Sequence, residues 1–204
     1  MIAVAMGRYL TLEGRIHVEP DPIKRSRFVG DAAPVATADE AMAFVAEVRA
    51  QHAGAGHHCF AYRLGPGDQG FRVSDDGEPG GTAGQPILNH IDGAQLNHVV
   101  FVVTRYFGGT KLGKGGLIRA YGGTAGHAIA AANIVEVQRT QTLTIRCSYA
   151  DQGTVEGVLR SLNTAPSDTE FGADVCIKVA VPVGDVRNAT ALIIEATAGR
   201  ARPE

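Results

Sequence analysis

The side chains in this chain best suited to chemistry are basic residues and glycines gathered in one stretch. From Gly93 to Val135 the sequence contains no Asp or Glu. The candidate anion-binding residues within it are Arg105, Tyr106, Gly108, Gly109, Lys111, Lys114, Gly115, Arg119 and Tyr121. Glycine leaves backbone N–H groups bare for an anion, while lysine and arginine supply positive charge. The stretch therefore predicts contacts to phosphate groups, with the two tyrosines placed to stack on bases.

A nucleotide-binding loop is the nearest familiar pattern. Residues 108–115 read G-x-x-x-x-G-K-G, one position short of G-x-x-x-x-G-K-[ST]. The hydroxyl absent at Gly115 is the one that would hold Mg²⁺, and no strand ending in a suitable Asp stands out. The pattern does not favour nucleotide hydrolysis. A glycine-rich turn that serves packing alone stays open as an alternative.

The elements on either side of the glycines are predicted from their hydrophobic pattern. Residues 99–103 form a continuous apolar run, typical of a strand covered on both faces. After the glycines, apolar residues recur at helical spacing from Leu117 to Ala132. The helix would begin near Gly115–Leu117, so its positive dipole end would face the loop and favour an anion there.

A second basic segment precedes the apolar pair Phe28–Val29. Its charged residues are Lys24, Arg25 and Arg27. One interpretation is an edge strand whose charges discourage association with other edges. The other is an extension of the basic surface around the glycine loop.

Three carboxylates, Asp75, Asp76 and Glu78, lie in a loop rich in glycine and proline. Such carboxylates can bind Mg²⁺ or transfer protons. The favoured interpretation is a turn in which Asp75 and Asp76 cap backbone amides. A third interpretation is that these carboxylates neutralise the charge of the basic loop when no partner is bound.

His57 and His58 stand next to Cys59. Adjacent residues on a strand point to opposite faces, so the two histidines are not expected to share a metal ion. No oxyanion donor or third partner for a Cys–His pair is identifiable either. The sequence predicts no metal, no cofactor and no enzymatic activity.

Composition limits the class of protein. The chain has 204 residues, 45% of them hydrophobic, and a net charge of −2, which suits one large domain or two small ones. Three separated cysteines without a C-x-x-C pair indicate a reducing, cytoplasmic setting. No run approaches the ~20 apolar residues of a membrane span, and the first residues do not resemble a signal peptide. No membrane partner is predicted.

Two predicted domains follow from the remaining patterns. Thr37 and Glu40 form a capping box that opens a helix with Ala41, Phe44, Val45 and Val48 on its buried stripe. The pattern changes near residues 137–140. Beyond it, alternating and helical patterns give the order β-α-β-β-α with a brief or absent last strand, typical of a ferredoxin-like sandwich. The predicted domains are 1–137 and 138–204.

Long motifs in the chain resemble the YigZ/IMPACT family. They are residues 74–86 (SDDGEPGGTAGQP) and 102–121 (VVTRYFGGTKLGKGGLIRAY), and segments 57–59 and 24–28 agree. The resemblance covers nearly the whole chain. It implies an α/β (α+β) protein, with a βαβ domain like the second domain of a small-subunit ribosomal protein followed by a ferredoxin-like domain. Eukaryotic relatives regulate translation initiation through a ribosome-associated scaffold, but share only the first domain.

The sequence and the resemblance together predict a non-catalytic, translation-associated regulator that binds RNA or the ribosome through its glycine-rich basic loop. One alternative is a magnesium-dependent enzyme acting on a phosphorylated small molecule through Asp75, Asp76 or Glu78. The other is a protein-interaction module whose partner is a translation factor or regulatory protein. The oligomeric state is left open.

Overall fold

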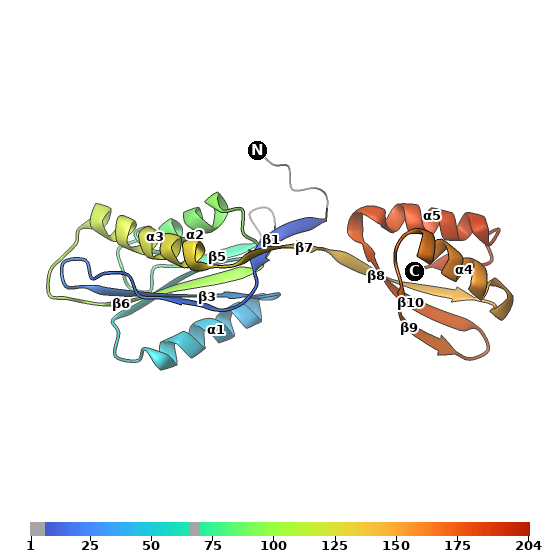
Figure 1. The fold of residues 1–204 in the computed structure, drawn as a ribbon. Coiled ribbons are helices and arrows are strands. Elements are labelled where there is room, and N and C mark those ends of the chain that lie inside the picture. The colour runs from blue at the N-terminus through green and yellow to red at the C-terminus, as the bar shows by residue number, and fades with distance from the viewer. Residues whose placement is uncertain (1–6, 66–69) are drawn as a thin grey trace. The chain divides into compact units, whose positions relative to one another are not determined.

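The computed structural model describes residues 7–65 and 70–204 as a mixed α+β protein with antiparallel sheets (Figure 1). The chain divides into two compact units. The first unit is Tyr9–Val137, and the second unit is Gln138–Glu204 together with the described residues Gly7 and Arg8. Strands β1 (Arg8–Leu12) and β7 (Ile134–Gln138) pair as a two-stranded sheet. Among the described residues no helix is both long and apolar enough to cross a membrane.

The first unit is organised by a five-stranded sheet in the order β2-β3-β6-β4-β5, with every neighbouring pair antiparallel. The strands are β2 (Ile16–Val18), β3 (Arg27–Pro34), β4 (His57–Arg63), β5 (Phe71–Ser74) and β6 (Val99–Tyr106). The central strand β6 is buried from its first residue to Arg105, which confirms the prediction of a strand covered on both faces.

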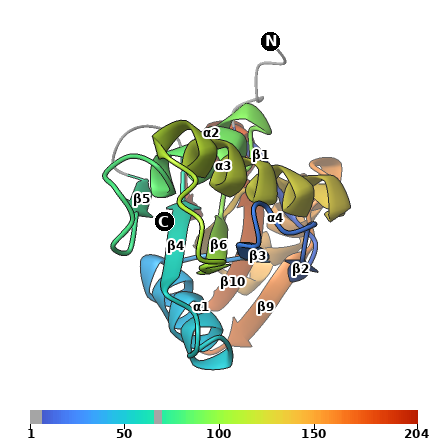
Figure 2. The same cartoon turned by 90° about the vertical axis from the view of Figure 1, so that its left-hand side faces the viewer.

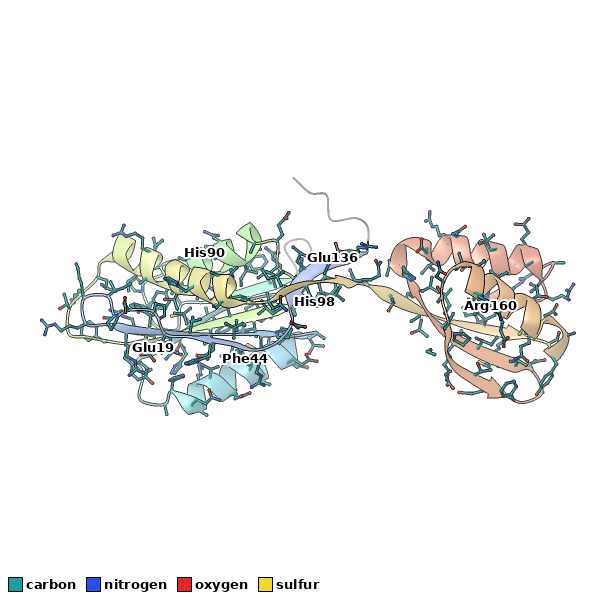
Figure 3. The ribbon with its side chains drawn as sticks, in the orientation of Figure 1. Glu19, Phe44, His90, His98, Glu136 and Arg160 are labelled. Atoms are coloured by element: carbon teal, nitrogen blue, oxygen red, sulfur yellow. The ribbon has the colours of Figure 1, made fainter. Side chains whose placement is uncertain are left out.

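Helix α1 (Ala38–Gln51) covers one face of this sheet, and α2 (Gly84–Gly93) and α3 (Lys114–Ala131) cover the other (Figures 1 and 2). The capping box of α1 is confirmed. Thr37 Oγ1 accepts the Glu40 N–H at 3.2 Å, and the Glu40 carboxylate accepts the Ala36 N–H at 2.8 Å. The predicted stripe of α1 is buried, including Phe44, which Figure 3 labels. Helix α2 was missed from sequence because a segment opening with glycine and proline is typical of a loop.

The strand register brings four loops together at one end of the sheet, here called the loop end. Phe28 on β3 and His57 on β4 both lie opposite Arg105 on β6, and Phe60 lies opposite Ser74. Segments 19–26, 52–56, 75–83 and 107–113 therefore leave the sheet on the same side. Figure 1 shows the β2–β3 and β6–α3 connections side by side at the left.

Strand β3 as a whole lies between β2 and β6, so it is not an edge strand of the sheet. Its first three residues, Arg27–Val29, nevertheless pair with β6 alone, because β2 reaches only Gly30–Ala32. Lys24 and Arg25 precede the strand, in a tight turn between Ile23 and Ser26. Each of these two flanking residues accepts the other's backbone N–H at 2.9 Å.

The second unit places β8 (Thr140–Cys147), α4 (Tyr149–Ser161), β9 (Pro166–Phe171), β10 (Val175–Pro182), a short 3₁₀ helix (Val183–Asp185), α5 (Val186–Ala196) and β11 (Arg202–Pro203) in chain order. Its antiparallel sheet has the order β11-β8-β10-β9, and both α-helices cover one face (Figure 1). Alternate residues such as Ile145 and Ile177 form the core. The last strand is brief, as the pattern predicted.

Candidate functional site

A buried ionic cluster lies beneath the loop end. The side chain of Arg105 is 6% exposed and that of Glu78 is 4% exposed, and Nη1 donates to Oε1 at 2.7 Å. The hydroxyl of Tyr121 donates to the same carboxylate oxygen at 2.7 Å. Burying two opposite charges is costly unless each is paired and hydrogen-bonded. The Tyr121 hydrogen bond therefore helps to hold Glu78 against Arg105.

This cluster corrects two sequence predictions. Tyr121 is 0% exposed, with its ring edge-on to Phe28 at 5.3 Å between centroids, so it offers no surface to a base. Burial, reinforced by Cys59 and Glu78, raises the pKa of Tyr121 far above its usual value, which keeps the hydroxyl as a donor. The Arg105 guanidinium is likewise occupied inside the protein and does not face a phosphate. Both residues were predicted as ligand contacts because sequence does not report burial.

The other two acidic residues of this loop, Asp75 and Asp76, also bind groups within the protein. Asp75 accepts N–H groups from Gly81 at 2.8 Å and from Ala83 and Gly84, both at 2.9 Å. It thereby caps α2, whose own N-cap residue Ala83 has no side chain able to do so. Burial would raise the pKa of Asp75, but the three donors outweigh burial and lower it. The interpretation of this carboxylate as a backbone cap is confirmed.

Asp76 is also occupied. One of its carboxylate oxygens accepts the His58 N–H at 2.7 Å, and the other pairs with Arg49. Its backbone carbonyl lies 2.9 Å from His57 Nδ1. His58 Nε2 instead lies 3.1 Å from the His52 carbonyl oxygen. Across the described residues, no group of three or more Cys, His, Asp or Glu side chains is arranged to hold a metal ion.

Cys59 is fully buried, and its thiol donates to the Asp75 carbonyl oxygen at 3.0 Å. Burial is the main cause that raises its pKa to about 12; Tyr121 opposes the shift, while the carboxylates of Glu78, Asp76 and Asp75 add to it. The thiol stays protonated near neutral pH. This state does not suit a nucleophile, which must be a thiolate.

The turn at Lys24 and Arg25 has an unusual backbone. Their φ angles are +46° and +66°, in the left-handed region that residues other than glycine rarely adopt. Two consecutive non-glycine residues in this region each carry a strain on the order of 1 kcal/mol. Both side chains are exposed. The fold therefore maintains a strained turn that presents two cations.

Gly108 packs directly against that turn. A Cβ placed on Gly108 would lie 2.0 Å from the Arg25 carbonyl carbon, so only glycine fits. The buried Ser26 hydroxyl oxygen accepts the Gly108 N–H at 3.2 Å and Arg105 Nη2 at 3.3 Å. Ser26 thus connects the strained turn, the glycine loop and the buried cluster. Gly109, the next residue, has a φ of +84°.

The remaining predicted cations are exposed. Lys111 lies in the loop, and α3 begins at Lys114 after Gly113, with no side-chain cap and no acidic residue in its first turn. Arg119 folds back along the helix, since a Cβ on Gly115 would lie 3.7 Å from its Nη1. The N-terminal end of the α3 dipole is positive, as are these side chains, so both attract an anion.

We define the basic surface as Lys24, Arg25, Lys111, Lys114 and Arg119. All five are exposed, and in the part of the chain that the structure describes none has an ion-pair partner. Arg27 differs, because it pairs with Glu19 at 2.7 Å and lies over the Tyr106 ring at 4.5 Å (Glu19 is labelled in Figure 3). Tyr106 is half-buried, and its hydroxyl lies 2.9 Å from His52 Nδ1.

Sequence reasoning missed Phe107. Its ring is 57% exposed, and the Arg105 guanidinium lies 5.3 Å from the ring centroid. The available signal was that a large aromatic residue stands where the buried strand ends and the glycines begin. That signal does not separate Phe107 from its neighbour Tyr106, because the exposure of each depends on where β6 leaves the sheet.

These features define a class: a two-unit α+β protein in which a buried Arg–Glu–Tyr cluster supports an exposed, glycine-rich basic loop. Residues 24–129 match the family described as the Impact N-terminal domain, and residues 145–200 match the domain of unknown function DUF1949. The chain belongs to the IMPACT family and has the two-domain organisation of its YigZ-like members.

Curated relatives and a solved structure agree with this assignment. The chain is 35% identical to the IMPACT family member YigZ of Escherichia coli over 88% of its own length and 89% of that protein. It is 41% identical to an IMPACT family member of Thermus thermophilus over 79% and 87% of the two lengths. A crystal structure of a hypothetical protein superposes with a TM-score of 0.73 at 33% identity and covers 97% of both chains.

Proposed function

We propose that this chain is a non-catalytic, translation-associated regulator in the cytoplasm that binds RNA or the ribosome through the basic surface. The observation that carries the proposal is a set of five exposed cations that have no ion-pair partner among the described residues, in a chain whose net charge is −2. Cations left unpaired at one surface attract a polyanion, and phosphate neutralisation supplies most of the affinity for nucleic acid.

The local backbone supports the same proposal. The N–H groups of the first turn of α3 point out of the helix beside Lys111 and Lys114 and receive no side-chain cap. The strained turn presents Lys24 and Arg25 where Asn and Gly would fit without strain. Backbone strain is enriched at functional sites, and here it falls on two consecutive cations.

The enzyme alternative has less support. The Asp75 carboxylate accepts backbone N–H groups, and that of Asp76 accepts a backbone N–H and pairs with Arg49. The Glu78 carboxylate pairs with Arg105 and accepts the Tyr121 hydroxyl. None of the three is left for a metal ion or a substrate proton. For the second unit we propose the ferredoxin-like fold, because its strand order agrees with a β-α-β-β-α-β arrangement.

The double substitution Lys111→Glu with Lys114→Glu tests the proposal. We expect affinity for a single-stranded RNA to fall roughly tenfold or more, and the slope of log affinity against log salt to become shallower by about 1 to 2. Fluorescence anisotropy of a labelled RNA across a salt series measures both. The matched control is Arg160→Glu with Arg187→Glu, which changes the net charge equally at exposed positions on α4 and α5. Equal affinity loss in both pairs would refute a local site.

The strained turn provides a second test. Lys24→Asn with Arg25→Gly should stabilise the protein by about 1 to 2 kcal/mol, because these residues accept positive φ, while RNA affinity falls. Lys24→Gln with Arg25→Gln is the control, since it removes both charges and keeps the strain. It should weaken binding without any stability gain. Urea unfolding and RNA titration of the full chain measure the two effects, and unchanged RNA affinity in both variants would exclude the turn from the site.

A further inference from the structure

Phe107 combines exposure with a fixed position. More than half of its surface is exposed, and the Arg105 guanidinium lies over one face of the ring, 5.3 Å from the ring centroid. That guanidinium is held by Glu78 at 2.7 Å and by the Ser26 hydroxyl at 3.3 Å. The ring is therefore supported from within the protein, which reduces the entropy lost when a ligand packs on its open side.

The surroundings of Phe107 are cationic. The next residue, Gly108, lies in direct contact with the backbone of Arg25, and the same loop continues to Lys111. Two other exposed aromatic rings are described, Tyr149 and Phe171, which stack on each other at 6.5 Å in the second unit. Phe171 lies on β9, which carries the acidic residues Asp168 and Glu170, and Tyr149 begins α4. An exposed ring beside cations that pair with no carboxylate of residues 7–65 or 70–204 suits a ligand that is both aromatic and anionic.

We propose that Phe107 stacks on an unpaired base of single-stranded RNA while the basic surface contacts the phosphates on either side. This inference rests on the proposed function and narrows its ligand. The bases of an A-form duplex are stacked and paired inside the helix, so a single aromatic side chain reaches them only where the strand is unpaired. Stacking of this kind is tolerant of base identity, because every base has an aromatic face. Arg105 is a positioning residue for the ring, not a phosphate contact.

A tryptophan reporter tests the contact directly. The chain contains no tryptophan, so Phe107→Trp introduces a single tryptophan at the proposed stacking position, whose emission can be excited at a wavelength that the tyrosines do not absorb. We expect a single-stranded RNA of about 12 nucleotides to quench its emission, and a perfectly paired duplex of the same length to quench it far less. The control is Phe171→Trp, at a phenylalanine that is 64% exposed, where we expect no quenching by either RNA.

Affinity measurements separate stacking from charge. Phe107→Ala should weaken single-strand binding at least about fivefold with the salt slope unchanged, and Phe107→Tyr should restore most of the affinity. Unfolding midpoints close to that of the original chain would show that the loss is not structural.

Three outcomes would overturn the inference. One is that Phe107→Ala binds single-stranded RNA as tightly as the original chain while the Lys111/Lys114 variant does not, in which case the proposed function stands and stacking fails. Another is that duplex and single strand bind Phe107→Trp with equal quenching. The third is quenching by single-stranded DNA but not by RNA. Failure of the original chain to bind any RNA would remove the proposed function as well.

Discussion

Replacing Glu78 by glutamine should destabilise the protein by about 3 to 5 kcal/mol, because Arg105 would keep its charge in the interior without a carboxylate. Both side chains are more than nine-tenths buried, so water does not compensate for the lost partner. The Tyr121 hydroxyl would also lose a charged acceptor. Urea unfolding of the full chain, followed by circular dichroism, measures the loss.

The control for this prediction is Glu170→Gln. Glu170 also pairs with a cation at 2.7 Å, but its side chain is 63% exposed and that of its partner Lys178 is 39% exposed. An exposed pair contributes about 0 to 1 kcal/mol, so the control should unfold almost as the original chain does. Exchanging both Glu78 and Arg105 for methionine should recover part of the stability, since no buried charge remains. A Glu78→Gln loss no larger than that of the control would contradict the buried pair.

Gly108→Ala should cost about 3 kcal/mol and abolish much of the RNA affinity, because the new methyl group would overlap the backbone of Arg25 and Ser26 at 2.0 to 2.4 Å. No side chain can move aside to relieve this contact, since the opposing atoms belong to the backbone. The turn that presents Lys24 and Arg25 would have to shift, and the hydrogen bond from Gly108 to Ser26 would break. Thermal unfolding and RNA titration measure the two losses.

Gly80→Ala is the matched control for Gly108. A Cβ on Gly80 meets no atom within 4 Å, and its φ is not in the left-handed region. We expect its stability and its RNA affinity to stay within error of the original chain. If Gly108→Ala also left stability and RNA affinity unchanged, the close contact between Gly108 and the turn at Arg25 would be contradicted.

Local patterns were enough to predict much of the fold. The apolar run of β6, the capping box at Thr37 and the alternation in β8 and β10 each report a local periodicity or a backbone hydrogen bond, and the structure confirms them. Helix α2 escaped because its cap, Asp75, lies eight residues before Ala83, outside any local capping pattern. When the capping side chain comes from a preceding turn, the residues at the helix start carry no capping signal in the sequence.

By itself the sequence determined that the chain has a strand, a glycine-rich basic loop and a helix in succession, and that no acidic residue accompanies them. Only the tertiary structure decided which of the cations face outward. Strand register placed Arg105 opposite Phe28 and His57, where Glu78 reaches it from a loop 27 residues earlier. The same register left Lys111, Lys114 and Phe107 outside the core. Charge is a property of composition, whereas exposure depends on contacts between segments far apart in the chain.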